Sequence, residues 1–318
     1  MPEIPSISVV IPLYNKSPYI ARALNSILSQ TFQDFEVIVV DDGSTDKGAT
    51  IVKKFKDPRI RLILQDNQGV SVARNRGIEE TRSELIAFLD ADDEWLPNHL
   101  ETLLRLWNRY PEAGAYGTAY LIKEKEFATA QIAPFSNEIP QKPWEGLLPS
   151  YFKSATLGYS PISSSTVAIP KSILIEMDGF ISNEWWGEDT DLWGRIALKY
   201  PVAFSWDGMG IYHTESLNRA SKKIELVLEN IFVTSAHRAI LAGKVPREFQ
   251  EDLQEYIASK QIQTAGHNLD ACRPDLARRI LMNCETRNLW KSKYWTLFWT
   301  YVPSRIFIIL KKIKSKVF

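Results

Sequence analysis

The chain has 318 residues, of which 45% are hydrophobic and 24% are charged, as is usual for a protein with a packed core. This composition excludes wholesale disorder and a collagen-like repeat, and two cysteines are too few for a disulfide scaffold. The 38 basic and 38 acidic residues cancel, so we expect no nucleic-acid partner. Residues 291–318 nevertheless hold seven Lys and Arg and no Asp or Glu, so the neutral total conceals an acidic body and a basic tail.

Targeting and membrane-spanning signals are weak throughout the chain. The N-terminus lacks a basic segment, and its apolar run from Ile7 to Leu13 is short for a signal peptide. The most apolar later stretch, 294–310, is interrupted by Pro303 and Arg305 and falls below the ~18 apolar residues of a spanning helix. We therefore expect a cytoplasmic protein.

Strands alternate with helices over the first 110 residues. β-branched runs and 3.6-residue periods predict strand 7–11, helix 18–30, strand 36–40, helix 46–56, strand 60–64, helix 70–82, strand 85–89 and helix 97–110. Ser17 followed by Pro18 predicts the cap of the first helix. This alternation implies right-handed βαβ units and an α/β fold with a mostly parallel sheet flanked by helices.

The later part of the chain divides in two. Short predicted strands at 115–121, 165–169 and 202–206 lie among loops rich in Pro, Gly and Ser, whereas 216–285 is helical. We therefore expect an α/β domain over residues 1–215 and a helical C-terminal region over 216–318 that ends in the basic tail.

Carboxylates follow two of the predicted strands at the edge where such sheets bind ligands. FLDADDEW delivers Asp90, Asp92 and Asp93 within four positions, and a divalent cation would relieve their mutual repulsion. Oxygen ligands suit Mg²⁺ or Mn²⁺ bridged to phosphate. VVDDGSTD places Asp42 before a tight turn, where it can accept hydrogen bonds from a base or a ribose. Helix capping by the triplet and an Asx turn at Asp42 are the alternatives.

A third acidic segment, EWWGEDTD, combines aromatic and acidic side chains. Trp185 and Trp186 can stack on the C–H faces of a sugar, and Glu188 and Asp189 follow directly. A carboxylate in such a semi-apolar setting has a raised pKa and can act as a base. The alternative is a helix N-terminus enriched in acids.

Four segments, in this order and spacing, resemble glycosyltransferase family 2. They are SVVIPLYNK (8–16), VDDGSTD (40–46), GVSVARNRGI (69–78) and FLDADD (88–93). The resemblance covers roughly residues 6–215. It implies the GT-A fold and an inverting transfer from a nucleotide-sugar donor.

The resemblance also implies roles for single residues of the donor site. Pro12, Tyr14 and Asn15 would hold the base and ribose, and Arg74 would lie near the base or the diphosphate. Asp42 would read the base, usually uracil, so a UDP-sugar is the expected donor.

The metal, expected to be Mn²⁺ or Mg²⁺, would be held at the DxD element. Asp90 would approach the ribose or reach the metal through water, and Asp92 would bind the metal. Asp93 and His213 are further candidate ligands, although a lone His is more often structural. The resemblance assigns the catalytic base to the Glu188–Asp189 pair, and we expect Asp189 to act, with Trp185 and Trp186 at the acceptor.

The tail, residues 289–318, contains an aromatic-rich run, then an aliphatic run, then a lysine cluster. Aromatic and basic residues flanking apolar ones suit a bilayer interface, so we expect peripheral membrane contact at the inner face. A helix packed on the body or on a second subunit, as in a homodimer, is the alternative. Membrane contact would favour a lipid-linked or other cell-envelope glycan acceptor.

Together these features predict a metal-dependent glycosyltransferase of polysaccharide or cell-envelope synthesis. A nucleotidyltransferase would need a glycine-rich phosphate loop after the first strand, and a Rossmann enzyme would need GxGxxG there; VIPLYNK has neither. A catalytically inactive nucleotide-sugar or glycan-binding module remains an alternative, against which the set Asp42, Asp90, Asp92 and Asp189 argues.

Overall fold

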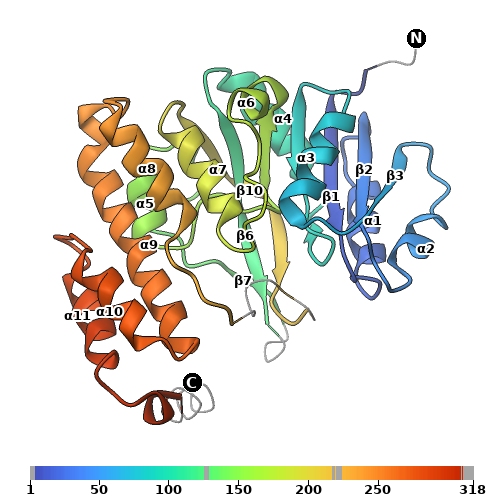
Figure 1. The fold of residues 1–318 in the computed structure, drawn as a ribbon. Helices are drawn as coiled ribbons and strands as arrows, with labels where there is room; N and C mark the ends of the chain where they lie inside the picture. Colours follow the sequence, from blue (N-terminus) through green and yellow to red (C-terminus); the bar gives the residue numbers. More distant parts are fainter. Residues whose placement is uncertain (1–3, 125–128, 217–218, 220–223, 309, 311–318) are drawn as a thin grey trace. The chain divides into compact units, whose positions relative to one another are not determined.

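The computed structural model describes residues 4–124, 129–216, 219, 224–308 and 310. The chain divides into two compact units, Met1–Arg219 and Ala220–Phe318, and the sequence places this boundary after residue 215. The first unit is built on one sheet with helices on both faces, and the described part of the second contains only helices (Figure 1).

Four parallel strands form one half of the sheet. They are β1 (Ile7–Leu13), β2 (Phe35–Asp42), β3 (Ile60–Gln65) and β4 (Leu85–Phe88), in the order β3-β2-β1-β4. Every pairing among them is parallel. This half confirms the strands predicted from the first 90 residues and brings the ends of β1, β2 and β4 to one edge.

The other half of the sheet is mixed. Its strands are β9 (Val167–Pro170), β6 (Ala115–Lys123), β10 (Val202–His213), β5 (Glu94–Trp95), β7 (Gln131–Ile132) and β8 (Glu145–Leu147). β9 is antiparallel to both β4 and β6, and β10 is parallel to β6. Because β9 reverses the direction twice, β6 and β10 run with β1, and their carboxyl ends share its edge.

Strand alternation decides which helix covers which face. Val37 and Val39 of β2 join the larger core, where α1 (Ile20–Leu28) and α4 (His99–Arg109) pack. Ile38 and Val40 point the other way, toward Ala73 of α3 (Val70–Glu80). Successive side chains of β2 are thus buried on opposite faces, as a sheet covered on both faces requires.

The remaining helices of the first unit are short. They are α2 (Gly48–Val52), α5 (Tyr151–Leu157), α6 (Lys171–Glu176) and α7 (Glu188–Ala197). α3 approaches β1 closely at Gly77, where a Cβ atom would lie 2.3 Å from Cγ1 of Val10. Any larger residue at Gly77 would push the helix that carries Arg74 away from the sheet.

The predicted cap of the first helix is wrong. α1 begins at Ile20 with Tyr19 as its N-cap, and no side chain caps it. Residues 16–19 form a turn instead, in which the Lys16 carbonyl accepts from the amides of Tyr19 and Ile20. The Ser17 amide donates to Asp46 at 2.8 Å, so this segment is tied to the loop after β2.

His99, at the start of α4, is fully buried under β10. Its Nδ1 contacts the carbonyl of Gly208, and its ring lies 4.4 Å from that of Trp95 between centroids. Burial lowers the pKa of His99 to about 4, with the Gly208 carbonyl opposing the shift. The imidazole is therefore neutral at physiological pH.

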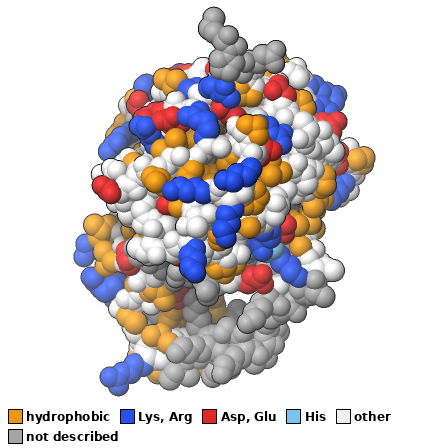
Figure 2. Space-filling view, turned by 90° about the vertical axis from the view of Figure 1, so that its right-hand side faces the viewer, with side chains coloured by type: hydrophobic (Ala, Val, Ile, Leu, Met, Phe, Trp, Pro, Cys, Tyr) orange, Lys and Arg blue, Asp and Glu red, His pale blue; other side chains and the backbone are white. Residues whose placement is uncertain are grey.

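Strand β3 forms an exposed edge of the sheet, which Figure 2 views directly. Lys and Arg side chains are spread over this face among hydrophobic and acidic ones. Arg61 pairs with Glu80 at 2.7 Å, and Arg82 pairs with Glu36 at 2.8 Å. Opposite charges interspersed in this way balance the field of the face.

The second unit is helical, as predicted. Its helices are α8 (Ile231–Leu241), α9 (Gln250–Asp270), α10 (Pro274–Met282) and α11 (Trp290–Trp299), with a 3₁₀ turn at Arg247–Phe249. Ala265, Leu269, Ala277 and Leu281 form its small core between α9 and α10. Among the described residues, no helix is both long and apolar enough to cross a bilayer.

Candidate active site at the carboxyl ends of the sheet

Asp42, at the end of β2, is only 2% exposed and organises the loop before α3. Its carboxylate accepts from Gln65 Nε2 at 2.7 Å, from the Gln68 amide at 2.9 Å and from the Gly69 amide at 2.8 Å. In this structure Asp42 therefore shapes the surroundings of the predicted base site, and its contact with a base stays a prediction.

Asn15 joins the loops that follow β1 and β2. Its backbone is left-handed (φ 51°), and its Oδ1 accepts from the amides of Thr45 at 2.8 Å and Asp46 at 3.3 Å. The neighbouring Tyr14 is 47% exposed, and Pro12 is half-buried. The structure thus brings these three predicted nucleotide contacts to one rim, with Asn15 as its brace.

Arg74 links the donor motif to the acceptor motif. The side chain is 4% exposed; Nη2 lies 2.9 Å from Asp90 Oδ1 and Nη1 lies 2.9 Å from Glu188 Oε1. Its guanidinium also lies 5.1 Å from the centroid of the Phe180 ring. Segments that are 114 residues apart in the chain therefore meet at one cation.

Arg74 offsets part of the negative charge of this network. Although burial opposes it, Asp90, Glu188 and Asp189 together raise the pKa of Arg74 above its usual range, so the guanidinium stays charged. Burial, followed by the nearby Asp189 charge, raises the pKa of Glu188, and Arg74 opposes this shift. Glu188 is thus committed to an ion pair.

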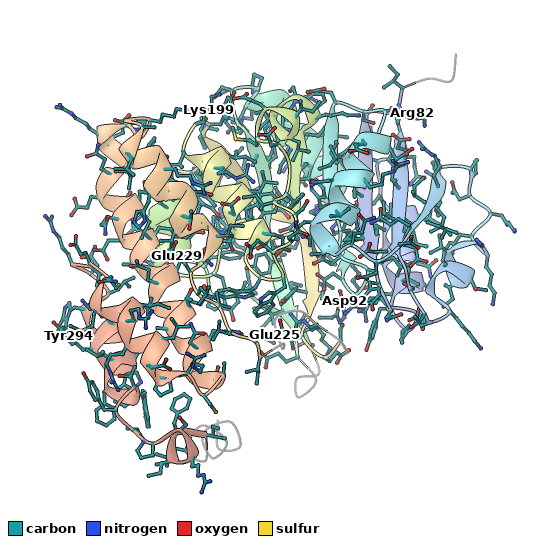
Figure 3. All side chains as sticks on the ribbon, in the orientation of Figure 1. Arg82, Asp92, Lys199, Glu225, Glu229 and Tyr294 are labelled. Carbon is teal, nitrogen blue, oxygen red and sulfur yellow. The ribbon has the colours of Figure 1, made fainter. Side chains whose placement is uncertain are left out.

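Asp92 is paired with a lysine that sequence reasoning left without a role. Lys16 Nζ lies 2.7 Å from Asp92 Oδ2, and both side chains are 12% exposed. Arg22 of α1 also donates to the backbone carbonyl of Asp92. Figure 3 labels Asp92 at the carboxyl-end edge of the parallel strands. The predicted metal ligand therefore already faces a cation supplied by the chain.

Asp93 points into the protein and is 1% exposed. Its Oδ2 accepts from Ser165 Oγ at 2.5 Å, and its Oδ1 accepts from the His213 amide at 2.9 Å. Burial first, and then repulsion from Asp92 and Asp90, raises its pKa well above the usual range. In this structure Asp93 acts as a tie between the acidic loop and β10.

The two ring nitrogens of His213 have different surroundings. Nε2 lies 2.8 Å from Glu94 Oε1, while Nδ1 is buried without a hydrogen bond in the described structure and lies 3.8 Å from Glu215 Oε1. A neutral imidazole that donates from Nε2 presents the lone pair of Nδ1, which is what a metal requires. No group of three His, Cys, Asp or Glu among the described residues has metal-holding geometry by itself. Sites completed by substrate phosphates need only one or two protein carboxylates.

Asp189 lies at the start of α7, after Gly187 in a left-handed conformation (φ 86°). It is half-buried; Oδ2 accepts from Ser164 Oγ at 3.2 Å and Oδ1 from the Thr190 amide at 2.6 Å. The rings of Trp185 and Trp186 precede it, 6.2 Å apart between centroids. The predicted base and the predicted acceptor contacts therefore belong to one turn of chain.

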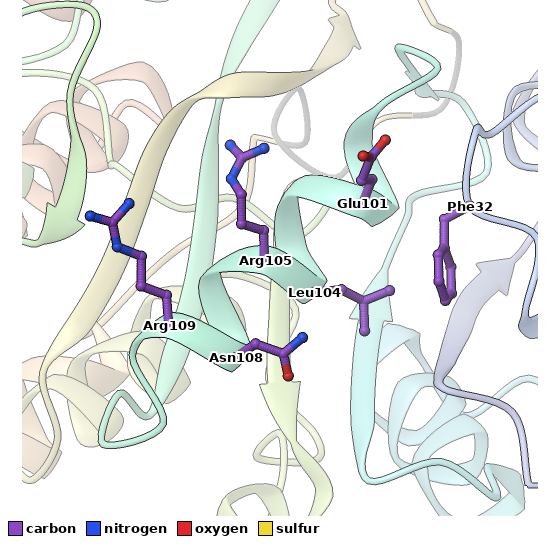
Figure 4. A pocket seen from close by; sticks show the side chains of 6 residues that line it. All are labelled: Phe32, Glu101, Leu104, Arg105, Asn108 and Arg109. Carbon is purple, nitrogen blue, oxygen red and sulfur yellow. The ribbon is translucent and has the colours of Figure 1, made fainter.

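A surface hollow of about 580 Å³ lies elsewhere, along the outer side of α4 (Figure 4). Phe32, Glu101, Leu104, Arg105, Asn108 and Arg109 line it. Arg105 and Arg109 both pair with Glu145, at 2.8 and 3.1 Å. None of the predicted site residues lines this hollow, and we do not assign the active site to it.

Three contributors to the site were missed by sequence reasoning. Lys16 belongs to the LYNK segment after the first predicted strand. Its positive charge was a usable signal, because three carboxylates were expected at the same edge of the sheet. Ser164 and Ser165, which contact Asp189 and Asp93, belong to a serine-rich loop that carries no distinctive pattern. Their role depends on the antiparallel insertion of β9, which the sequence pattern does not reveal.

Comparison with known proteins places this arrangement in a family. Residues 8–161 match the model described as "Glycosyl transferase family 2". The chain is 44% identical over 102 residues to the uncharacterized glycosyltransferase YibD of Escherichia coli, an alignment that covers 31% of this chain and 30% of YibD. The aligned part spans about a third of the length of several such curated relatives.

Solved structures share the fold. Staphylococcus aureus TarS 1-349 in complex with UDP-GlcNAc has a TM-score of 0.65 at 19% identity, covering 93% of this chain and 89% of that one. The mannosyltransferase PcManGT of Pyrobaculum calidifontis, in complex with GDP-Man and Mn²⁺, has a TM-score of 0.62 at 19% identity, covering 94% and 85%. The protein is thus of the GT-A fold class. Over residues 8–161 its sequence matches glycosyltransferase family 2.

Proposed function

We propose that the protein transfers a sugar from a nucleotide donor, a UDP-sugar, to a hydroxyl acceptor with inversion at the anomeric carbon. The observation that carries this proposal is the Arg74 bridge, which joins Asp90 of the donor motif to Glu188 of the acceptor motif. One buried cation that holds a donor-side and an acceptor-side carboxylate would keep the two substrates close and oriented, which accelerates a direct transfer between them.

Asp189 is the proposed catalytic base. It would take the proton from the acceptor hydroxyl as that oxygen attacks the donor, a step worth ~10²–10⁴-fold in rate. Glu188 has a different role, because its carboxylate forms an ion pair with Arg74. The Ser164 hydroxyl and the Thr190 amide each donate to one Asp189 oxygen, which fixes the carboxylate and leaves a further lone pair on each oxygen for an acceptor proton.

The proposed metal contacts are Asp92 and the Nδ1 atom of His213, with the donor diphosphate completing the shell. A divalent cation supplies charge stabilisation for the departing diphosphate. Asp93 is a weaker candidate, since both of its oxygens accept hydrogen bonds from the chain. When a metal binds Asp92, Lys16 would leave that carboxylate and pair with the donor diphosphate. Each anion would then still have a cation beside it.

We place the reaction in the cytoplasm, with an acceptor among cell-envelope or polysaccharide glycans, lipid-linked ones included. The basic, aromatic tail supports this placement, because it suits an anionic membrane where such acceptors lie. TarS and PcManGT are bound to UDP-GlcNAc and GDP-Man in their structures, so a donor panel must include both nucleotides.

The experiment is a panel of UDP- and GDP-sugars with Mn²⁺ or with EDTA, read out as nucleotide release. Asp189→Asn should lower turnover at least 100-fold and leave donor affinity within about twofold, because the group acts on the acceptor. Glu184→Gln, an exposed acid in the same segment, is the matched control and should keep full activity. Near-normal turnover by Asp189→Asn refutes the base, and indifference to EDTA refutes the metal.

A further inference from the structure

The outward side of α11 carries large aromatic side chains that the rest of the described chain leaves uncovered. Trp290, Tyr294, Trp295 and Phe298 are 50–61% exposed, and Tyr301 just beyond the helix is 66% exposed. At 100° per residue the four helical aromatics fall within a sector of about 140°. Figure 3 labels Tyr294 on the side of α11 that faces away from α9 and α10.

The rest of the circumference of α11 is anchored. Leu297 and Trp299 pack against the core of the second unit. Arg278 of α10 donates to the Thr300 carbonyl at 2.6 Å, and Lys293 Nζ donates to the Cys284 carbonyl at 2.7 Å. The aromatic side is therefore presented by a helix that is already packed, so its exposure does not come from a loose end.

Two of the exposed aromatics form a ring cluster with Trp299 at the centre of this side. The Trp295 and Phe298 rings stack 5.9 Å apart, and both contact the anchored Trp299 ring at 5.5 and 5.4 Å. Five aromatic side chains at this exposure present roughly 500 Å² of apolar surface. That is near the upper end for a single patch on a monomeric protein, where such patches commonly mark an interaction site.

The charges around this surface identify the partner. Lys291 Nζ lies 5.5 Å from the Trp290 ring centroid, and Arg305 is exposed. Residues 291–318 contain seven basic residues and no acidic one. Three of the seven lie in the described part of the chain, and the other four, at 311–316, lie outside it. Two copies meeting through this face would bring like charges together, whereas an anionic lipid surface neutralises them.

We propose that the aromatic face of α11 docks onto an anionic bilayer surface, with its Trp and Tyr rings at headgroup depth and with Lys291 and Arg305 against lipid phosphates. Trp and Tyr prefer this depth because one end of each ring system is polar. Docking of this kind needs no spanning helix. It is independent of the proposed transfer reaction.

The test is co-sedimentation of the full chain with vesicles of phosphatidylcholine containing 30% phosphatidylglycerol. Trp290→Ser combined with Trp295→Ser and Phe298→Ser should weaken binding at least tenfold. The matched control, Leu228→Ser combined with Leu241→Ser and Met282→Ser, changes exposed apolar residues of the same unit and should bind like wild type. Circular dichroism of each variant verifies that the helices remain.

A second variant separates charge from apolar contact. Lys291→Gln with Arg305→Gln should weaken binding to the anionic vesicles about tenfold or more and leave the weak binding to pure phosphatidylcholine unchanged. Three results would each overturn the proposal. These are absence of wild-type binding to anionic vesicles, equal binding by the aromatic variant, and a lipid-free wild-type dimer that the aromatic variant turns into monomers in sedimentation velocity. The last result would assign the face to a second copy.

Discussion

Replacing Arg74 by methionine should destabilise the first unit strongly, because it removes the partner of a buried carboxylate. Breaking a buried ion pair from one side costs about 3–5 kcal/mol. Asp90 is 30% exposed and can rehydrate, so most of the loss comes from Glu188, which is 12% exposed. We expect about 3 kcal/mol, a large share of the stability of an ordinary domain.

The double variant Arg74→Met with Glu188→Gln tests whether the unpaired Glu188 carboxylate causes the loss of stability. It removes the stranded charge and should recover about 2 kcal/mol of the loss. The pKa of Glu188 is already raised, and it rises further without Arg74. A carboxyl whose folded pKa exceeds its unfolded value stabilises at low pH and loses that contribution as pH rises through the folded pKa, so the Arg74→Met deficit should be larger at pH 8 than at pH 5.

Urea-dependent hydrogen exchange of peptides from β1 and β4 measures this unit separately from the second. The ion-pair reasoning fails if the single and double variants are equally destabilised within about 0.5 kcal/mol. A deficit that does not depend on pH would likewise contradict it.

Three further predictions concern other residues. Lys16→Gln should tighten Mn²⁺ binding about tenfold in electron paramagnetic resonance titrations, because Mn²⁺ no longer displaces a cation from Asp92; an unchanged affinity would exclude that competition. Burial lowers the pKa of His99 from 6.5 to about 4, so the wild type should lose about 3 kcal/mol of unfolding free energy as pH drops from 7 to 4. His99→Gln should flatten this dependence of unfolding free energy on pH, and equal dependences in the two proteins would contradict the reasoning. Asn15→Ala should lower the free energy of unfolding by about 1–2 kcal/mol, because it removes hydrogen bonds and places alanine in a left-handed backbone conformation. Asn15→Gly, measured in the same thermal melts, loses the hydrogen bonds without the backbone strain and so separates the two contributions.

The strand ends were the most predictable part of the site. β-branched runs bounded by polar residues locate β1, β2 and β4 within one or two residues, and parallel pairing then brings Asn15, Asp42 and Asp90 to one edge. A continuous apolar run carries this information because each of these strands is buried on both faces. Helix starts were less predictable, as Ser17 shows, because an amide of the turn is taken by Asp46.

The division of labour among neighbouring carboxylates was not predictable. Asp90, Asp92 and Asp93 look equivalent in sequence, yet one pairs with Arg74, one with Lys16, and one is buried against Ser165. The partners of Asp92 and Asp93 lie 76 and 72 residues away in the chain, so only the folded sheet selects them. The same reason separates Glu188 from Asp189.

The serine run before β9 has a consequence for how this site can change in evolution. Ser164 contacts Asp189, and the next residue, Ser165, contacts both Asp93 and the amide of Asp90. Two adjacent hydroxyls therefore link the acidic loop to α7 and fix the distance between them. A point substitution at Ser164 or Ser165 removes the hydrogen bonds of that residue alone, but an insertion or deletion of one residue shifts the contacts of both at once. Length, more than composition, is the property that this loop must keep.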